Sequence, residues 1–125
     1  MAGRYDPEAF VAAIFGGNKA HLRPLYEEIL RFGLSVADDV KVCPCATMIP
    51  FYRKHVIAQV RVPNRSRIDL GFALGEMKPA GRLIDTGGFA KKDRITHRIE
   101  ISSPQDFSDE PKKWFCRAYE RDAPH

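Results

Sequence analysis

Arginine side chains recur in the middle of the chain at spacings that favour binding of an anion. Arg53, Arg61 and Arg67 fall on the same side of two predicted strands. The planar guanidinium fork matches carboxylate and phosphate groups in two-point contacts. We therefore expect a basic sheet face for an anionic small molecule, a nucleic acid or a protein. The alternative is a solvated face on which Asp69 pairs with Arg61 or Arg67, because exposed ion pairs are common and weak.

A second group of polar residues fills the segment between Asp85 and His97. A loop of this length in a small domain usually binds something or folds on itself. We expect an ordered loop in which Asp85 and Asp93 accept backbone or arginine hydrogen bonds, with Arg94 or Arg98 as the charge partner. The candidate ligand-binding residues of this segment are Asp85, Gly87, Gly88, Asp93, Arg94 and His97.

The same segment offers an enzymatic alternative, in which Asp85, Asp93 and His97 form a catalytic site. Residues 83–87 also carry the apolar-apolar-Asp-Thr-Gly pattern of aspartic proteases. That chemistry needs two carboxylates that share a proton, so a single copy would require a homodimer with Asp85 on its axis. The charged stretch that follows and the predicted helices disfavour a protease. Alternation with Ile95 and Ile99 instead favours a His97 that is held by a hydrogen bond on the apolar side.

The cysteines do not indicate a metal centre. Cys43 and Cys45 are separated by one residue, whereas structural zinc sites usually present two pairs with wider spacing. We predict no metal and no cofactor. The total of three cysteines excludes complete pairing within the chain and favours reduced thiols, hence a cytoplasmic location.

The placement of the arginines on one face depends on a predicted hairpin, whose turn lies at residues 63–66. Apolar residues alternate along both of its strands, at Val56, Ala58, Val60 and Val62 and then at Ile68, Leu70, Phe72 and Leu74. Period-two alternation places each apolar set on one face of a sheet. The opposite face then receives the arginines, with Ile57, Gly71 and Ala73 among them.

Helical patterns flank the strand-rich region. Asp6-Pro7-Glu8 predicts the start of a short helix, and Leu22 to Leu34 predicts a second that ends near Gly33. Trp114 to Tyr119 predicts a C-terminal helix. Further strands are expected at residues 40–43, 47–52 and 95–101. These elements predict an α+β fold, an antiparallel sheet of about five strands with helices packed on one face. The predicted core comprises Leu25, Ile29, Val60, Leu70, Phe72, Ile99, Trp114 and Phe115.

Length and charge agree with this organisation. A chain of 125 residues is most simply one domain, and we expect residues 1–18 to form an N-terminal helix and linker before a single domain at 19–125. The net charge of +4 permits an anionic partner without requiring one. No apolar run is long enough to span a membrane, so no membrane association is predicted.

Several stretches together resemble a bacterial family of domains of unknown function. The matching stretches are residues 22–26, 42–48, 67–71, 81–88 and 92–99, within a resemblance that covers Lys19 to Ala123. Members of that family occur alone, behind a small helical domain, or at the C-terminus of longer proteins labelled predicted transport proteins. The resemblance implies a compact α+β domain and brings no catalytic residues with it.

These observations favour a small, cytoplasmic, non-enzymatic module that binds an anionic ligand or partner. Arg53, Arg61 and Arg67 would hold the ligand with help from the Gly87-Gly88 loop. Two other classes stay open: an enzyme with a site at the Asp85–His97 loop, and a domain that assembles with itself, for example as a homodimer.

Overall fold

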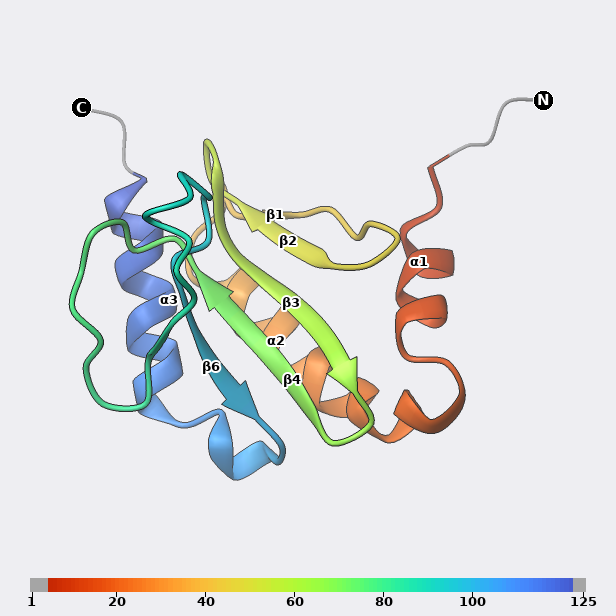
Figure 1. Ribbon diagram of the computed structural model, residues 1–125. Coiled ribbons are helices and arrows are strands. Elements are labelled where there is room, and N and C mark those ends of the chain that lie inside the picture. Colours follow the sequence, from red (N-terminus) through yellow and green to blue (C-terminus); the bar gives the residue numbers. More distant parts are fainter. Residues whose placement is uncertain (1–4, 123–125) are drawn as a thin grey trace.

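A computed structural model describes residues 5–122 as three α-helices and one open antiparallel sheet (Figure 1). The helices are α1 (Pro7–Ile14), α2 (Arg23–Ser35) and α3 (Asp109–Arg121), and two 3₁₀ turns, η1 (Gly17–Leu22) and η2 (Pro104–Asp106), precede α2 and α3. The strands are β1 (Lys41–Val42), β2 (Ile49–Tyr52), β3 (Val56–Asn64), β4 (Arg67–Phe72), β5 (Ile84–Asp85) and β6 (His97–Ile101). The predicted α+β fold is confirmed.

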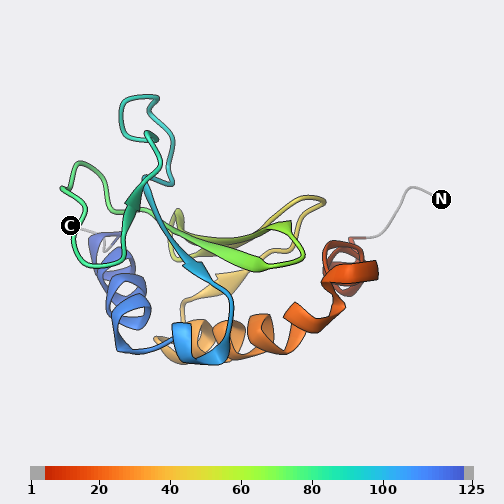
Figure 2. The same cartoon turned by 60° about the horizontal axis from the view of Figure 1, so that its bottom comes forward.

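The six strands lie in the order β1-β2-β3-β4-β6-β5, and every neighbouring pair is antiparallel. The prediction of about five strands is approximately right, because β1 and β5 are two-residue strands at the edges of the sheet. Helices α2 and α3 cover one face of the sheet, and residues 86–96 rise from the other face (Figure 2). We call these the covered face, the open face and the 86–96 loop.

The first two helices form as their local sequence predicts. Asp6 caps α1 by accepting a hydrogen bond from the backbone N–H of Ala9, and Pro7 occupies the first turn. Val11 and Phe15 are buried in the common core. Residues 5–15 therefore pack on the same hydrophobic core as the sheet, and the division at residue 18 stays a prediction.

The sequence position of Gly33 suggested that it ends the second helix, but it does not. Helix α2 continues to Ser35, and Gly33 is buried against two aromatic rings. A Cβ atom at this position would lie 2.8 Å from the Phe51 ring and 2.9 Å from the Phe115 ring. The glycine therefore serves close packing between α2, β2 and α3 rather than termination of the helix.

The core lies between the sheet and α2 with α3. All eight residues predicted for it are buried. Phe115 of α3 packs edge-on against Phe51 of β2, with ring centroids 5.3 Å apart, and against Phe32 of α2 at 5.7 Å. Trp114 is 7 % exposed and donates its ring N–H to Glu110. These contacts join the two helices and the sheet into one hydrophobic unit.

A bulge in β3 alters the predicted alternation at one end of the hairpin. Phe51 pairs with Ala58 and Tyr52 pairs with Val56, so Ile57 is the extra residue on β3. Ile57 is fully buried, whereas Val56 is only half-buried and faces the open side. The prediction that Val56 faces the core and Ile57 the opposite side was therefore wrong, because a bulge shifts the side-chain register by one residue.

The start of β6 departs from alternation in a similar way. Regular pairing with β4 begins at His97, where His97 faces Phe72. The prediction that Ile95 shares the side of His97 and Ile99 was wrong. Ile95 turns onto the open face, where its methyl group covers Gly71. Thr96 makes this transition possible because its backbone N–H donates to the Phe72 carbonyl and its hydroxyl accepts from Leu74 N–H.

Candidate functional site

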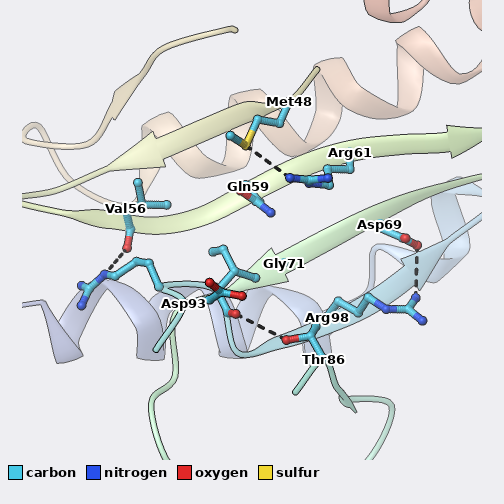
Figure 3. A pocket seen from close by; sticks show the side chains of 11 residues that line it. Met48, Val56, Gln59, Arg61, Asp69, Gly71, Thr86, Asp93 and Arg98 are labelled. Atoms are coloured by element: carbon cyan, nitrogen blue, oxygen red, sulfur yellow. Dashed lines mark hydrogen bonds and ion pairs between the residues drawn. The ribbon is translucent and has the colours of Figure 1, made fainter. Parts of the chain in front are cut away.

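A cavity of about 490 Å³ lies on the open face between the sheet and the 86–96 loop (Figure 3). Strands β3, β4 and β6 form its floor, and the loop forms one wall. Its volume falls within the range of small-molecule sites. The lining residues are Met48, Val56, Gln59, Arg61, Asp69, Gly71, Thr86, Asp93, Arg94, Ile95 and Arg98.

Gly71 allows the loop to approach the floor of this cavity. A Cβ atom at residue 71 would lie 2.7 Å from the Ile95 methyl group and 3.4 Å from Gln59 Cγ. The missing side chain therefore leaves room for Ile95 to pack onto the strand. Together with Val56, exposed by the β3 bulge, Ile95 supplies the apolar part of the cavity lining.

Four charged side chains of β4 and β6 pair with one another, and two of them, Asp69 and Arg98, line the cavity. Asp69 accepts hydrogen bonds from Arg67 Nε at 2.8 Å and from Arg98 Nη1 at 3.3 Å. Glu100 accepts a 2.8 Å hydrogen bond from Arg98 and lies 3.5 Å from Arg67. The hydrogen bond from Arg98 is the largest cause of a lowered pKa for the Glu100 carboxyl. This part of the basic face is therefore a paired network of two cations and two anions.

Arg61 differs from these arginines because no carboxylate lies within ion-pair distance of it in residues 5–122. The one hydrogen bond of the Arg61 side chain within residues 5–122 is a weak one, which Nη2 donates to the Met48 sulfur at 3.9 Å. Arg61 and Asp69 face each other across the β3–β4 pair, but Asp69 bonds to Arg67 and Arg98 instead. Arg61 is thus the cation of the cavity that is left available for an anion.

Arg94 anchors the 86–96 loop to the rest of the domain through both ends of its guanidinium group. Its Nε donates to the Val56 carbonyl at 2.8 Å, and its Nη2 pairs with Asp122 at 3.0 Å. Asp122, whose side chain is 5 % exposed, also accepts from the backbone N–H groups of Lys54 and His55 and pairs with the His55 ring. This one carboxylate therefore connects the end of α3, the β2–β3 turn and the 86–96 loop.

The ionised form of Asp122 is favoured by these contacts. Burial opposes the charge and raises the pKa of the carboxyl, but the hydrogen bonds from His55 and Lys54 and the charge of Arg94 outweigh it. The result is a pKa below the usual range for aspartate. His55 is largely exposed, so the buried partner in this group is Asp122 alone.

The 86–96 loop is ordered largely through its own backbone. Asp85 accepts a 2.7 Å hydrogen bond from Gly87 N–H, as predicted, and Thr86 accepts one from Gly88 N–H. Gly88 is buried, and a Cβ atom there would overlap the Ile95 carbonyl oxygen. The loop therefore needs glycine at residue 88 to close on itself.

Asp93 does not have the role predicted for it within the loop. Its backbone N–H donates to the Gly88 carbonyl at 2.8 Å, but within residues 5–122 its side chain has no hydrogen bond or ion pair. The expected pairing with Arg94 or Arg98 was wrong, because Arg94 bonds to Asp122 and Arg98 to Asp69 and Glu100. The Asp93 carboxylate instead lines the cavity, exposed.

Arg53 lies apart from the cavity. Its Nε pairs with Asp39 at 3.1 Å, and its guanidinium lies 4.0 Å from the ring centroid of Tyr119 in α3. The expectation that Arg53 would lie close to Arg61 and Arg67 was wrong. Residues 53–55 form the turn between β2 and β3, so strand alternation does not extend to them.

His97 is a buried, hydrogen-bonded residue, as the sequence indicated. Its Nε2 lies 2.8 Å from the Met77 carbonyl and its Nδ1 lies 2.8 Å from the Thr96 hydroxyl. Because a carbonyl only accepts, Nε2 carries the proton and Nδ1 accepts from Thr96. Asp85 and His97 are register partners, away from the cavity that Asp93 and Arg94 line.

Sequence reasoning missed several contributors to the site, among them Met48, Gln59, Thr86 and Asp122. Gln59 alternates with Arg61 on the open face, so strand periodicity could have identified it. Asp122 carried no such signal, because its partners lie 28 to 68 residues away in the chain.

Neither a cluster of metal ligands nor a helix able to span a membrane occurs in residues 5–122. No group of three or more His, Cys, Asp or Glu side chains in this range is placed to hold a metal ion. Cys45 lies beside Cys43, with its sulfur 3.2 Å from the Cys43 carbonyl oxygen. None of the described helices is both long and apolar enough to cross a bilayer.

Comparison with known proteins gives one match. A family model described as "Domain of unknown function (DUF5655)" matches residues 11–122, which include every residue that lines the cavity. No curated protein and no solved structure matches the chain at a significant level.

Proposed function

We propose that this chain, which belongs to the DUF5655 family of domains of unknown function, is a non-enzymatic module. It binds a small anionic ligand in the open-face cavity. The observation that carries the proposal is the state of Arg61. It is the cavity arginine with no carboxylate partner within residues 5–122, whereas Arg94 and Arg98 are both paired. An unpaired guanidinium beside an apolar surface favours binding of a carboxylate or phosphate group.

The cavity favours a small molecule over a nucleic acid. Proteins that bind single strands usually stack bases on exposed aromatic side chains. The described lining of this cavity contains no aromatic residue. Met48, Val56 and Ile95 instead offer apolar surface in the same cavity as Arg61, which suits a compact organic anion.

The binding proposal is preferred to an enzymatic one because two of the three groups suggested for catalysis, Asp85 and His97, are already engaged, which leaves Asp93 without them as partners. Both ring nitrogens of His97 are hydrogen-bonded, and an Asp85 oxygen is held by Gly87 N–H. A general base must reach the proton that it removes. The protease-like motif at Asp85 therefore is better explained as a turn that begins the 86–96 loop.

The wider setting of the module follows from the sequence. We propose a bacterial, cytoplasmic protein, based on the family resemblance and on three cysteines that cannot all pair within the chain. Self-association as a homodimer stays a prediction, which measurement of the molar mass in solution would test.

Titration of small anions into isotopically labelled protein, followed by backbone amide NMR, tests the proposal. The probes are inorganic phosphate, acetate, butyrate, ribose phosphate and a nucleoside monophosphate. We expect at least one to shift amides of residues 59–61, 71 and 93–95. Arg61→Gln should weaken binding by roughly tenfold, because it removes a charge-assisted hydrogen bond.

Arg65→Gln is the matched control, since Arg65 is exposed in the same hairpin and does not line the cavity. It makes the same change in net charge and should leave affinity within about a factor of two at moderate salt. Equal weakening in both variants would show a nonspecific charge effect. That result, or the lack of any Arg61-dependent shift across the panel, would overturn the proposal.

A further inference from the structure

The cavity contains two more polar side chains that have no partner within residues 5–122. Gln59 lies two residues before Arg61 on β3, and its amide is half-buried on the open face. Asp93 reaches the same cavity from the 86–96 loop. Figure 3 shows Gln59 and Arg61 on the strand and Asp93 across from them, beside Gly71. The unpaired groups are therefore one cation, one amide and one carboxylate.

The other charged groups around the cavity are balanced. Asp69 is held by Arg67 and Arg98, and Arg94 is held by Asp122. Asp93 has no such compensation, although two arginines, Arg94 and Arg98, line the same cavity.

A purely anionic ligand would meet a mixed environment here. Its negative group would be attracted by Arg61 on the floor and repelled by the Asp93 carboxylate of the loop wall. A ligand with a second, positive end removes this conflict, because its ammonium group can pair with Asp93. The Gln59 amide can then accept from the ammonium or donate to the anion, since it carries both functions.

We propose that the natural ligand is a small zwitterion, with its carboxylate or phosphate at Arg61 and a protonated amine at Asp93. This inference rests on the proposed function and names the chemical class of the ligand. Val56 and Ile95 line the same cavity and would contact the carbon chain that separates the ligand's charges. The cavity volume of about 490 Å³ is sufficient for a molecule of amino-acid size.

The test compares zwitterions with matched anions in the same NMR titration. Glycine, β-alanine, γ-aminobutyrate and δ-aminovalerate are paired with acetate, propionate, butyrate and valerate. Phosphoethanolamine paired with ethyl phosphate distinguishes a phosphate from a carboxylate. At the chain length that fits, we expect the zwitterion to bind about fivefold more tightly than its partner, the upper range for one exposed ion pair.

Two variants assign the groups. Asp93→Asn should remove the advantage of the amine while leaving anion binding in place, and Arg61→Gln should weaken both members of a pair. Asp38→Asn is the matched control, because Asp38 is exposed and lies outside the cavity lining. It should preserve the difference between zwitterion and anion.

The outcomes separate this inference from the function on which it rests. Arg61-dependent binding of anions with no advantage for any amine would overturn the zwitterion and leave the anion-binding function standing. An Asp93→Asn variant that binds zwitterions more tightly than the unmodified protein would also overturn it, since the carboxylate would then be repulsive. The lack of any Arg61-dependent binding would overturn both.

Discussion

The two faces of the sheet differ in chemistry, because one is packed with apolar side chains and the other carries charged ones. On the covered face, Phe51 and Phe115 are fully buried and pack edge-on, and Gly33 lies against both rings. On the open face, the charged side chains of β4 and β6 pair with one another, whereas Arg61 of β3 has no carboxylate partner within residues 5–122. The difference indicates that stability comes mainly from the covered face, which leaves a few groups on the open face free to bind.

The faces are not independent, because Asp122 links them. It ends α3, which packs on the covered face, and it holds Arg94 of the loop that forms the wall of the cavity. A change in the packing of α3 would therefore reach the cavity through this carboxylate. The following three substitutions test the contrast between the faces and this link.

The largest effect is expected on the covered face. Phe115→Ala should lower the free energy of unfolding by about 3–5 kcal/mol, because it removes a fully buried ring and leaves a cavity between α2, β2 and α3. Urea denaturation followed by tryptophan fluorescence measures it. Leu34→Ala is the control, since Leu34 is 44 % exposed on α2. A loss below about 1 kcal/mol for Phe115→Ala would contradict the assignment of stability to this face.

An intermediate effect is expected where the faces are linked. Asp122→Asn should cost about 2–3 kcal/mol, because it places an amide against backbone N–H groups and removes the partner of Arg94. The same variant should shift amides of residues 93–96 by NMR. His55→Ala should cost less than about 1 kcal/mol, since the His55 ring is largely exposed. Equal losses in the two variants would contradict the central role of Asp122.

The Asp122 contribution should also depend on pH in a defined direction. The native pKa is below the usual value, so the unfolded chain binds a proton at Asp122 more readily than the folded protein does. The stabilisation is therefore complete above the unfolded pKa of about 4 and declines as the pH falls through the lower native pKa. The stability difference between the unmodified protein and Asp122→Asn should therefore narrow as the pH falls below about 4, which urea denaturation at a series of pH values measures.

The smallest effect on stability is expected on the open face. Asp69→Asn should change the free energy of unfolding by no more than about 1 kcal/mol, because its ion pairs are partly exposed. The same change removes one of the two carboxylates that Arg67 and Arg98 contact within residues 5–122 and leaves Glu100 as the other. Affinity for an anionic probe should therefore rise, and its salt dependence should become steeper. A large loss of stability with unchanged anion affinity would make this face structural rather than available for binding.

Much of the fold could be predicted because local rules govern it. The α1 cap at Asp6, the apolar stripe of α3 and the alternation along β3 and β4 all follow from spacing alone. The errors fall where a local rule is interrupted, at the bulge that buries Ile57 and at the irregular start of β6 that places Ile95 on the open face. Alternation cannot anticipate an extra residue, because the bulge depends on the partner strand.

The sequence by itself determined the α+β class, the core residues, the buried and bonded state of His97 and the presence of arginines on one strand face. Only the tertiary structure decided which arginine is available. Five arginine side chains with the same chemistry differ only in the carboxylate beside each. Asp39 pairs with Arg53, Asp122 pairs with Arg94, and Asp69 pairs with both Arg67 and Arg98. Arg61 has no carboxylate partner within residues 5–122. Several of these pairings join residues far apart in the chain. Their strength depends on distances of a few ångströms, which are set by the packing of the loop and α3 on the sheet.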